Sequence, residues 1–440
     1  MPKLFRIRTQ PSSSGKNHLQ SYPQKPDEFS ELFLMMIKCF RQFGLYTVRI
    51  RYVKGHPRFE ASRVLVVIAV LILLSSWVVL VVSFFLQYRT PVVTGVANHI
   101  QFITNVLALT ASLGIAIFKG NELNGILQDF CVIDDELSYF SVRLPHKQLK
   151  KGFLRFYVIH VVFLIVSILF DGYVMLIMST ETPIWLWFFH LLPFTLYSLA
   201  FMNAFMMIRW VKLRINLLNT LIDQYHCYPM FNEMGHNNFK LTTIILMNGG
   251  EDHLAPKDAV EEPTISTRIL TIVSRTIDLA TRLESYNGLL FLFGYLALFC
   301  VTTIQVYYCY LHVAIGSTSK GFSGVSLALS VLIIVGNMIA TLAIPYICEQ
   351  VGDEFKTLMS YLSKLSMRYG QNMQSSIWFP NLISSIKFSA MGFFNMNYSM
   401  LSGFIAGLIT YLIIFIQFNA IVPADDSTQQ LVRAMKEQKQ

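Results

Sequence analysis

The sequence predicts an all-α membrane protein with seven transmembrane helices, several of which continue into an intracellular anchor bundle. Hydrophobic residues make up 54% of the 440 residues and charged residues only 14%, a composition typical of membrane proteins. Seven continuous apolar segments reach the roughly 20 residues that a helix needs to cross the hydrocarbon core. Strands of a membrane β-barrel are about half that length and alternate in polarity, so the segments indicate helices.

The apolar segments divide the chain in order. Spans are expected at 64–86, 93–118, 156–178, 184–208, 289–311, 325–346 and 399–421. The first 30 residues contain no apolar signal-peptide core, so 1–30 is expected to be a disordered cytosolic segment and the first span to direct insertion. Residues 31–63 are expected to form an interfacial or cytosolic helix, and 422–440 an extracellular tail.

Lysine and arginine are distributed unevenly between the two ends of the spans. Thirty of the 35 lie before the first span or in the segments that follow the second, fourth and sixth spans. The positive-inside rule therefore predicts a cytosolic N-terminus and an extracellular C-terminus. This asymmetry also accounts for the net charge of +9, so no nucleic-acid partner is expected.

The segments on the predicted inner side show helical periodicity with one apolar face. They lie within 119–155, 209–288 and 347–398. Such faces pack either against one another, as an anchor bundle that copies of the chain could share, or flat on the inner leaflet with basic residues at the head groups. The periodicity fails between 224 and 263, where a flexible linker is expected.

Polar and aromatic side chains collect in the predicted outer half of five spans. Amide and ionisable groups inside a membrane are costly and therefore functional candidates. The predicted ligand-binding residues are Gln101, Asn105, Asp171, Trp187, His190, Gln305, Tyr308 and Asn337. Aromatic faces with a few hydrogen-bonding groups suit a small-molecule pocket, although aromatic residues at span ends also form the interfacial belt.

Sequence signatures of catalysis are absent. The chain has no HExxH, GxSxG, P-loop or paired-cysteine zinc pattern, motifs that mark common catalytic and metal sites. We therefore expect no enzymatic activity, no cofactor and no metal site.

The last span carries small and polar residues along one face. Gly403, Gly407, Thr410, Ile414 and Gln417 follow one another at helical spacing. Thr410 and Gln417 differ by only about 20° around the helix. The Gln417 amide either hydrogen-bonds a neighbouring helix of the same subunit or meets water at a symmetry axis between copies. Spacing alone leaves both interpretations open.

The segment TYLIIFIQF at 410–418 resembles the C-terminal signature of insect gustatory receptors, and 388–397 resembles the segment that precedes the last helix in that family. The resemblance implies a homotetrameric or heterotetrameric plasma-membrane channel, gated by a tastant and permeable to monovalent and divalent cations. It also implies that the seventh helices line the pore, with Thr410, Ile414, Gln417 and Phe418 at the gate. An outward-facing cavity would hold the tastant, and membrane lipids would surround the assembly.

The ligand class and the receptor type have alternatives. Sugar-sensing relatives often carry an acidic residue after the Thr-Tyr pair, where this chain has Leu412. This residue and the aromatic pocket favour bitter or plant-derived compounds, whereas Asp171, Gln305 and Asn337 leave a fructose-like sugar open. A G-protein-coupled receptor needs an extracellular N-terminus, which the charge asymmetry opposes. A transporter and an olfactory receptor subunit are further alternatives.

Overall fold

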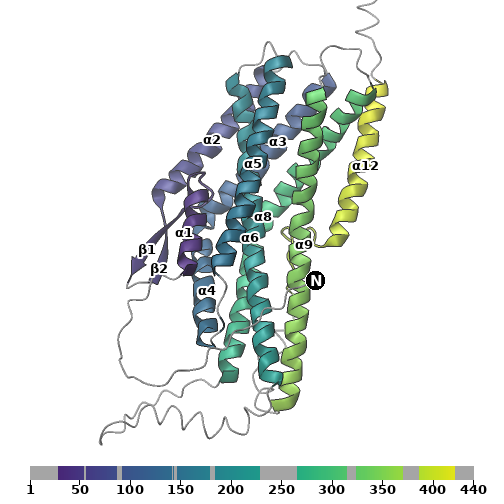
Figure 1. Cartoon of the computed structure of the whole chain (residues 1–440). Coiled ribbons are helices and arrows are strands. Elements are labelled where there is room, and N and C mark those ends of the chain that lie inside the picture. The colour runs from purple at the N-terminus through teal and green to yellow at the C-terminus, as the bar shows by residue number, and fades with distance from the viewer. Residues whose placement is uncertain are drawn as a thin grey trace, which may run out of the picture.

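The computed structural model describes residues 28–53, 56–86, 92–140, 142, 146–178, 184–227, 265–314, 324–369 and 386–421. In chain order the elements are α1 (Glu28–Arg41), β1 (Val48–Val53), β2 (His56–Ala61), α2 (Arg63–Leu86), α3 (Val92–Phe118), α4 (Gly120–Tyr139), α5 (His146–Met178), α6 (Ile184–Cys227), α8 (Ile265–Ala314), α9 (Gly324–Tyr369) and α12 (Tyr398–Ile421) (Figure 1). Most of the predicted N-terminal segment 1–30 and linker 224–263, and all of the tail 422–440, lie outside the described residues.

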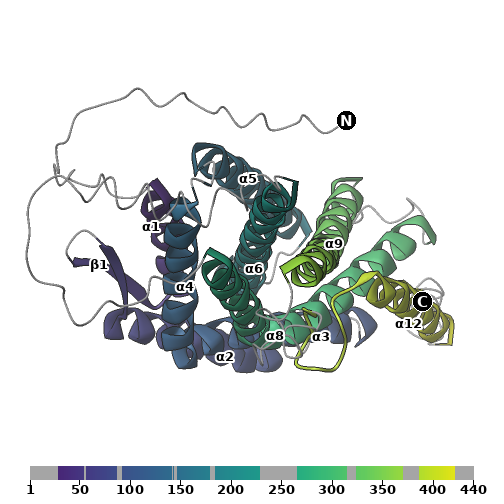
Figure 2. The same cartoon turned by 90° about the horizontal axis from the view of Figure 1, so that it is seen from below.

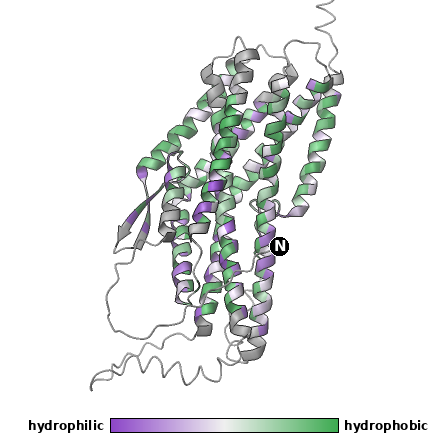
Figure 3. Cartoon of the chain, in the orientation of Figure 1, coloured by the Kyte–Doolittle hydropathy of each residue, from purple (hydrophilic) through white to green (hydrophobic). Residues whose placement is uncertain are grey.

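Among the described residues, seven helices are long and apolar enough to cross a membrane, as the sequence predicts. They are α2, α3, α5, α6, α8, α9 and α12, and each begins or ends within a few residues of a predicted span at one end at least. The lipid-facing sides of α2 and α5 carry large exposed apolar side chains, among them Val64, Leu71, Ile159 and Leu169. Figure 3 shows hydrophobic residues along these helices. The protein is therefore a multi-pass membrane protein.

Three of the helices are far longer than a membrane is thick. α6 has 44 residues, α8 has 50 and α9 has 46. At 1.5 Å per residue they are about 65 to 75 Å long, more than twice the hydrocarbon thickness of about 30 Å. Figure 1 shows all three running well past the lower ends of α2 and α12. The sequence prediction that helices continue beyond the membrane is confirmed.

The parts of these helices below the membrane pack together with α4. We call this region the lower bundle, and it comprises α4 with residues 209–227, 265–288 and 347–369. The apolar faces that define the helical periodicity are buried there, including Leu123, Ile126, Leu127, Phe130, Ile133, Leu137, Val211, Ile215, Leu218, Ile222, Ile269, Val273, Leu283, Val351, Phe355, Leu358 and Leu362. Of the two interpretations of these faces, packing against one another within a chain is the observed one.

A buried ion pair stands in the middle of the lower bundle. Nη2 of Arg214 lies 2.7 Å from Oδ2 of Asp134, and the Arg214 side chain is 1% exposed. Nη1 of Arg214 also donates to the Trp210 carbonyl oxygen at 3.0 Å, and the guanidinium lies 4.4 Å from the centroid of the Phe130 ring. Arginine tolerates this environment because its planar group can pair, donate and stack at the same time.

Closer to solvent, two arginines of α8 form ion pairs with carboxylates of α4. Arg275 pairs with Glu136 at 2.7 Å, and Arg282 pairs with Asp129. Partial burial raises the pKa of the Glu136 carboxyl above its usual value, and the neighbouring Arg275 guanidinium opposes that rise. The polar side of α8 thus binds α4 through Arg275 and Arg282. The sequence shows these arginines but not the carboxylates with which they pair.

One part of the fold departs from the sequence prediction. Residues 31–63 do not form a single helix, because α1 ends at Arg41 and an antiparallel hairpin of β1 and β2 follows. The physical reason is the period of two in VRIRYV, where Val48 and Ile50 alternate with Arg49 and Arg51. Alternation of this kind places apolar residues on one face of a strand and charges on the other.

Candidate functional site

The turn that leads into α12 is compact and tied to α8. The Ser389 hydroxyl donates to the Glu284 carboxylate at 2.6 Å and accepts from the Gly392 N–H at 3.2 Å. Met391 and Gly392 have φ angles of 53° and 79°, the left-handed region that glycine adopts without strain. A Cβ added at Gly288 of α8 would stand 3.2 Å from the Met391 backbone nitrogen. The turn at 388–397 therefore fits closely on α8.

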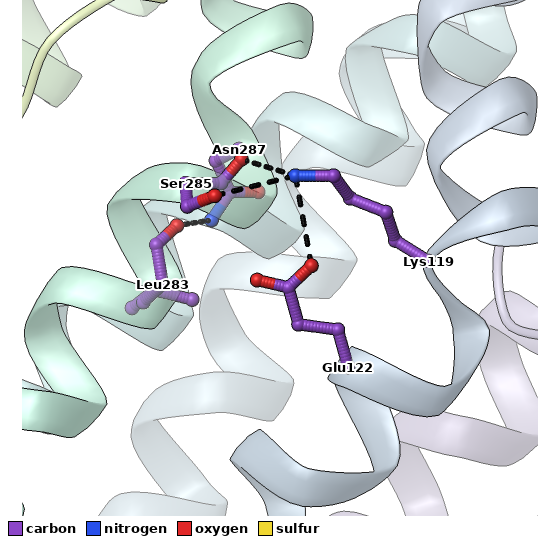
Figure 4. Close-up of polar contacts among 5 residues, drawn as sticks. All are labelled: Lys119, Glu122, Leu283, Ser285 and Asn287. Atoms are coloured by element: carbon purple, nitrogen blue, oxygen red, sulfur yellow. Dashed lines mark hydrogen bonds and ion pairs between the residues drawn. The ribbon is translucent and has the colours of Figure 1, made fainter.

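Ser285, the residue next to Glu284 in α8, contacts the junction of α3 and α4. The Lys119 ammonium, at the junction of α3 and α4, donates to the Ser285 carbonyl oxygen at 2.8 Å and lies 3.5 Å from the Glu122 carboxylate (Figure 4). Two residues further along, the Asn287 amide donates to the Leu283 carbonyl oxygen at 3.0 Å (Figure 4). This short stretch of α8 thus connects the α3–α4 junction with the base of α12.

Above the turn, the described helices contact α12 on one side only, through α8 and α9. The Phe299 ring lies 5.4 Å from Phe404 and 5.6 Å from Tyr411, and the Tyr307 ring lies 5.3 Å from Phe415, measured between centroids. A Cβ added at Gly407 would come within 3.0 Å of the Phe299 ring. In Figures 1 and 2 the helix stands at the edge of the helical domain.

The small and polar residues predicted to share one face of α12 differ in exposure. Thr410 and Gln417 are exposed, as is Gly403, while Ile414 and Gly407 are half-buried toward α8. The Thr410 hydroxyl donates to the carbonyl oxygen of Ala406 in its own helix at 2.9 Å. Phe418 lies in α12, but its side chain is outside the described residues. The polar members of the stripe therefore face away from the chain's own helices.

The predicted ligand-binding residues occupy five helices that pack on one another. Asn105, Gln305 and Asn337 are buried in α3, α8 and α9, and Gln101 and Tyr308 are half-buried. α8 contacts both α3 and α9 extensively. Asp171, Trp187 and His190 lie in α5 and α6, with side chains outside the described residues. The helices are brought together as predicted, and a shared pocket remains a prediction.

Several buried polar atoms of these helices have no protein hydrogen-bond partner among the described residues. They include Oδ1 of Asn105, Nδ2 of Asn337, the Tyr197 hydroxyl, Oγ1 of Thr302 and Oγ of Ser167. An unsatisfied buried polar group costs about 1–3 kcal/mol. Buried groups of this kind are candidates for contact with water or a ligand.

Sequence reasoning missed Thr302 and Ser167. Hydroxyl residues in a membrane helix usually donate to a carbonyl of the preceding turn, as Thr303 does to Phe299 at 2.8 Å. Sequence offers no signal that separates Thr302 from its neighbour, because the difference depends on the helix that packs against each.

A chain of aromatic contacts leads from this region to the base of α12. The ring centroids of Tyr197 and Phe201 are 6.3 Å apart, those of Phe201 and Tyr295 are 5.6 Å apart, and those of Tyr295 and Phe394 are 6.2 Å apart. The Tyr295 hydroxyl also donates to the Thr341 carbonyl oxygen of α9 at 3.2 Å. Tyr295 therefore contacts α6, α9 and the turn before α12.

Comparison with known proteins identifies the family. Residues 35–420 match the family described as 7tm Chemosensory receptor. The chain belongs to this family of chemosensory receptors. The resemblance to insect chemoreceptors found in the sequence is thereby confirmed, and the receptor family identifies the chain as something other than an enzyme. Among the described residues no group of three or more His, Cys, Asp or Glu side chains could hold a metal ion.

Solved structures of one insect receptor share the fold. The insect olfactory receptor OR5 from Machilis hrabei aligns with a TM-score of 0.59 at 12% identity, covering 89% of this chain and 100% of that chain. The same receptor in complex with eugenol aligns with a TM-score of 0.55 at 14% identity, with the same coverage. A comparison with curated proteins found no match. At these identities the likeness establishes the fold of the chemosensory receptor.

Proposed function

We propose that this chemosensory receptor is a gustatory receptor that acts as a tetrameric, tastant-gated, non-selective cation channel. The observation that carries the proposal is the exposed side of α12, where Thr410 and Gln417 lie on a helix that the described part of the chain covers on one side only. A side-chain amide facing hydrocarbon is unfavourable. The proposed arrangement removes this cost, because four copies of α12 around an axis place the amide at a water-filled pore.

The proposed membrane orientation follows from charge. Thirty of the 35 basic residues belong to segments on the side of the lower bundle, which supports a cytosolic position of that bundle and of the N-terminus. An epitope at residue 1 should be inaccessible to antibody in intact cells and accessible after permeabilisation. Accessibility in intact cells would favour a G-protein-coupled receptor and would contradict the proposal.

The proposed tastant site lies among α3, α5, α6, α8 and α9. The buried and unpartnered polar atoms of Asn105, Thr302 and Asn337 support it, because a ligand would supply the missing hydrogen bonds. A neighbour of the same fold was solved with eugenol, which supports a small-molecule ligand here. With Leu412 in place of an acidic residue, we favour bitter or plant-derived compounds.

The proposed gating mechanism uses the contacts of Tyr295. A ligand shifts the channel toward the open state only to the extent that it binds that state more tightly. If the tastant site repacks on opening, Tyr295 is positioned to transmit the change, since it contacts Phe201, Thr341 and Phe394. The seventh helices would then move so that Gln417 and Phe418 leave the axis.

The deciding experiment is whole-cell recording from cells that express the chain alone and with other gustatory receptors. Bitter compounds, plant-derived compounds and sugars including fructose are applied in turn. We expect a bitter or plant-derived compound to evoke a cation current, and Gln417→Ala to change its permeability or gating. Ser402→Ala, on the exposed side of α12 near its other end, is the matched control. Unchanged permeation and gating in both Gln417→Ala and Phe418→Ala would contradict the pore assignment.

A further inference from the structure

The β1–β2 hairpin has one apolar and one basic face. Val48 is fully buried and Phe59 nearly so, and both belong to the main hydrophobic core. Arg49, Arg51 and Arg58 are exposed. Five basic residues and a single acidic one lie between 48 and 63. The apolar face holds the hairpin on the protein, and the basic face is presented outward.

Two of the arginines face each other across the hairpin. Arg51 pairs directly with Arg58 in the antiparallel register, and Arg49 pairs with Glu60. Like charges at directly opposed positions destabilise a sheet. The Glu60 carboxylate lies 4.0 Å from Arg51 in an exposed setting, where an ion pair contributes little. An anion held between the two guanidinium groups would remove the repulsion.

The hairpin is fixed at the boundary of the first membrane span. The Ser62 N–H, between β2 and α2, donates to the Thr47 carbonyl oxygen at 2.7 Å. The Thr47 hydroxyl donates to the Ala116 carbonyl oxygen near the end of α3 at 2.7 Å. The outward face of α2 becomes apolar at once, since Val64 is 69% exposed and Val67 is 56% exposed. The hairpin therefore begins next to the start of a lipid-facing surface, with Arg49 nearest to that surface and Arg51 and Arg58 further along toward the turn.

The position of the hairpin leaves this basic face open to lipid. In both views the hairpin lies on the side of the helical domain opposite α12 (Figures 1 and 2). Figure 3 shows hydrophilic residues on the strands beside the hydrophobic α2. Copies that assembled around α12 would leave the hairpin at the periphery of the assembly.

We propose that the outward face of the β1–β2 hairpin, formed by Arg49, Arg51 and Arg58, binds the head groups of anionic phospholipids in the adjacent leaflet. Arginine matches phosphate and carboxylate groups with paired donors. Anionic lipids concentrate in the cytoplasmic leaflet, which is the leaflet that the predicted orientation places beside the hairpin. The inference does not depend on ligand gating or on the pore, because it concerns only a surface of the chain at the membrane boundary.

The test is a lipid titration of the full chain purified in a neutral detergent. Dioctanoyl phosphatidylserine, dioctanoyl phosphatidylcholine and inorganic phosphate are titrated separately, and bound molecules are counted by native mass spectrometry. We expect saturable binding of phosphatidylserine that weakens at high salt, and much weaker binding of the other two. Equal affinity for the two lipids, or binding of phosphate as tight as that of phosphatidylserine, would overturn the proposal.

Variants locate the site. Arg51→Gln together with Arg58→Gln should weaken phosphatidylserine binding by about thirtyfold, given the contribution of each surface basic residue. Lys356→Gln with Lys364→Gln, which removes the same charge from the exposed side of α9, should leave binding unchanged. The single change Arg51→Glu replaces repulsion with Arg58 by attraction and loses the exposed contact with Glu60, so it should leave the melting temperature close to that of the parent and still abolish binding. Parental affinity in Arg51→Gln/Arg58→Gln would refute the site.

A loss of this site is distinguishable from a failure of the proposed channel function. The titration uses no tastant and no current, so a chain that conducts nothing but binds phosphatidylserine retains the inference. Conversely, ligand-evoked currents in a chain without lipid selectivity would support the channel and refute the hairpin site.

Discussion

The lower bundle and α12 both consist of helices with distinct faces, but within the described part of the chain the apolar faces of the lower bundle are buried and most of α12 is not. In the lower bundle the apolar face of α4 is almost fully buried and Arg214 has its carboxylate partner. In α12, 6% of the apolar span is buried, against 61% in each of α3, α6 and α8. The lower bundle is thus a self-sufficient core, whereas the exposed side of α12 needs lipid, water or another copy.

Removing the buried Arg214 side chain should have the largest effect of the changes considered, and it acts on the lower bundle. Arg214→Met deprives Asp134 of its 2.7 Å ion-pair partner, and breaking a buried pair costs about 3–5 kcal/mol. We expect little correctly folded protein, measured by thermal unfolding in detergent and by surface expression. Adding Asp134→Asn should restore much of the loss. Equal stability of the single variant and the parent would show that the pair is not needed.

Filling a close helix contact should have the next largest effect. A Cβ at Gly294 would overlap the Phe201 ring, where α8 meets α6, while one at Gly352 in α9 would meet nothing within 4 Å. Gly294→Ala should therefore destabilise by about 1–3 kcal/mol through overpacking. Gly352→Ala should be neutral or stabilise by up to about 1 kcal/mol through helix propensity. The two melting temperatures, measured side by side, check this contrast.

A smaller effect is expected at Tyr295, which lies above the lower bundle and contacts the turn before α12. Tyr295→Phe removes the hydrogen bond to the Thr341 carbonyl but keeps the ring contacts with Phe201 and Phe394. Stability should fall by about 0.5–1.5 kcal/mol. Under the proposed gating mechanism the ligand concentration for half-maximal current should also shift, whereas Thr303→Ala, on the same helix, should not shift it. A parental dose response in Tyr295→Phe would argue against transmission through this residue.

A change on the open side of α12 should leave the single chain almost unaffected. Nothing lies within 4 Å of a Cβ added at Gly403, so Gly403→Leu should alter stability by at most about 1 kcal/mol. If copies of α12 pack together, the same change should reduce the tetramer fraction in cross-linking and native mass spectrometry. A normal assembly would place Gly403 against lipid instead.

The smallest effect is a pH dependence in the lower bundle. Because burial raises the pKa of the Glu136 carboxyl from 4.5, the folded chain holds that proton more tightly than the unfolded chain. The associated stability is present below pH 4.5 and is lost as the pH rises through the folded value. Glu136→Gln should remove this loss, so its stability relative to the parent should rise slightly over that range. Thermal unfolding against pH would measure it, and parallel curves would contradict it.

Much of the candidate site could be placed on its helices from sequence, but not its contacts. The stripe of α12 was predicted as one face, yet Gly407 packs on Phe299 while Thr410 and Gln417 remain exposed. Rotation of a helix by a few tens of degrees decides this division, and the rotation is set by the neighbouring helix. For the same reason Thr302 differs from Thr303 only in the folded chain.

The sequence by itself determined the seven spans, their continuation below the membrane and the buried faces of the lower bundle. These properties follow from local hydrophobic length and periodicity, which each helix carries independently of the others. Tertiary structure alone decided the pairing of Arg214 with Asp134, the attachment of Ser389 to Glu284 and the opposition of Arg51 and Arg58 in the hairpin. Each of these joins residues from two elements, so it depends on how the chain brings those elements together.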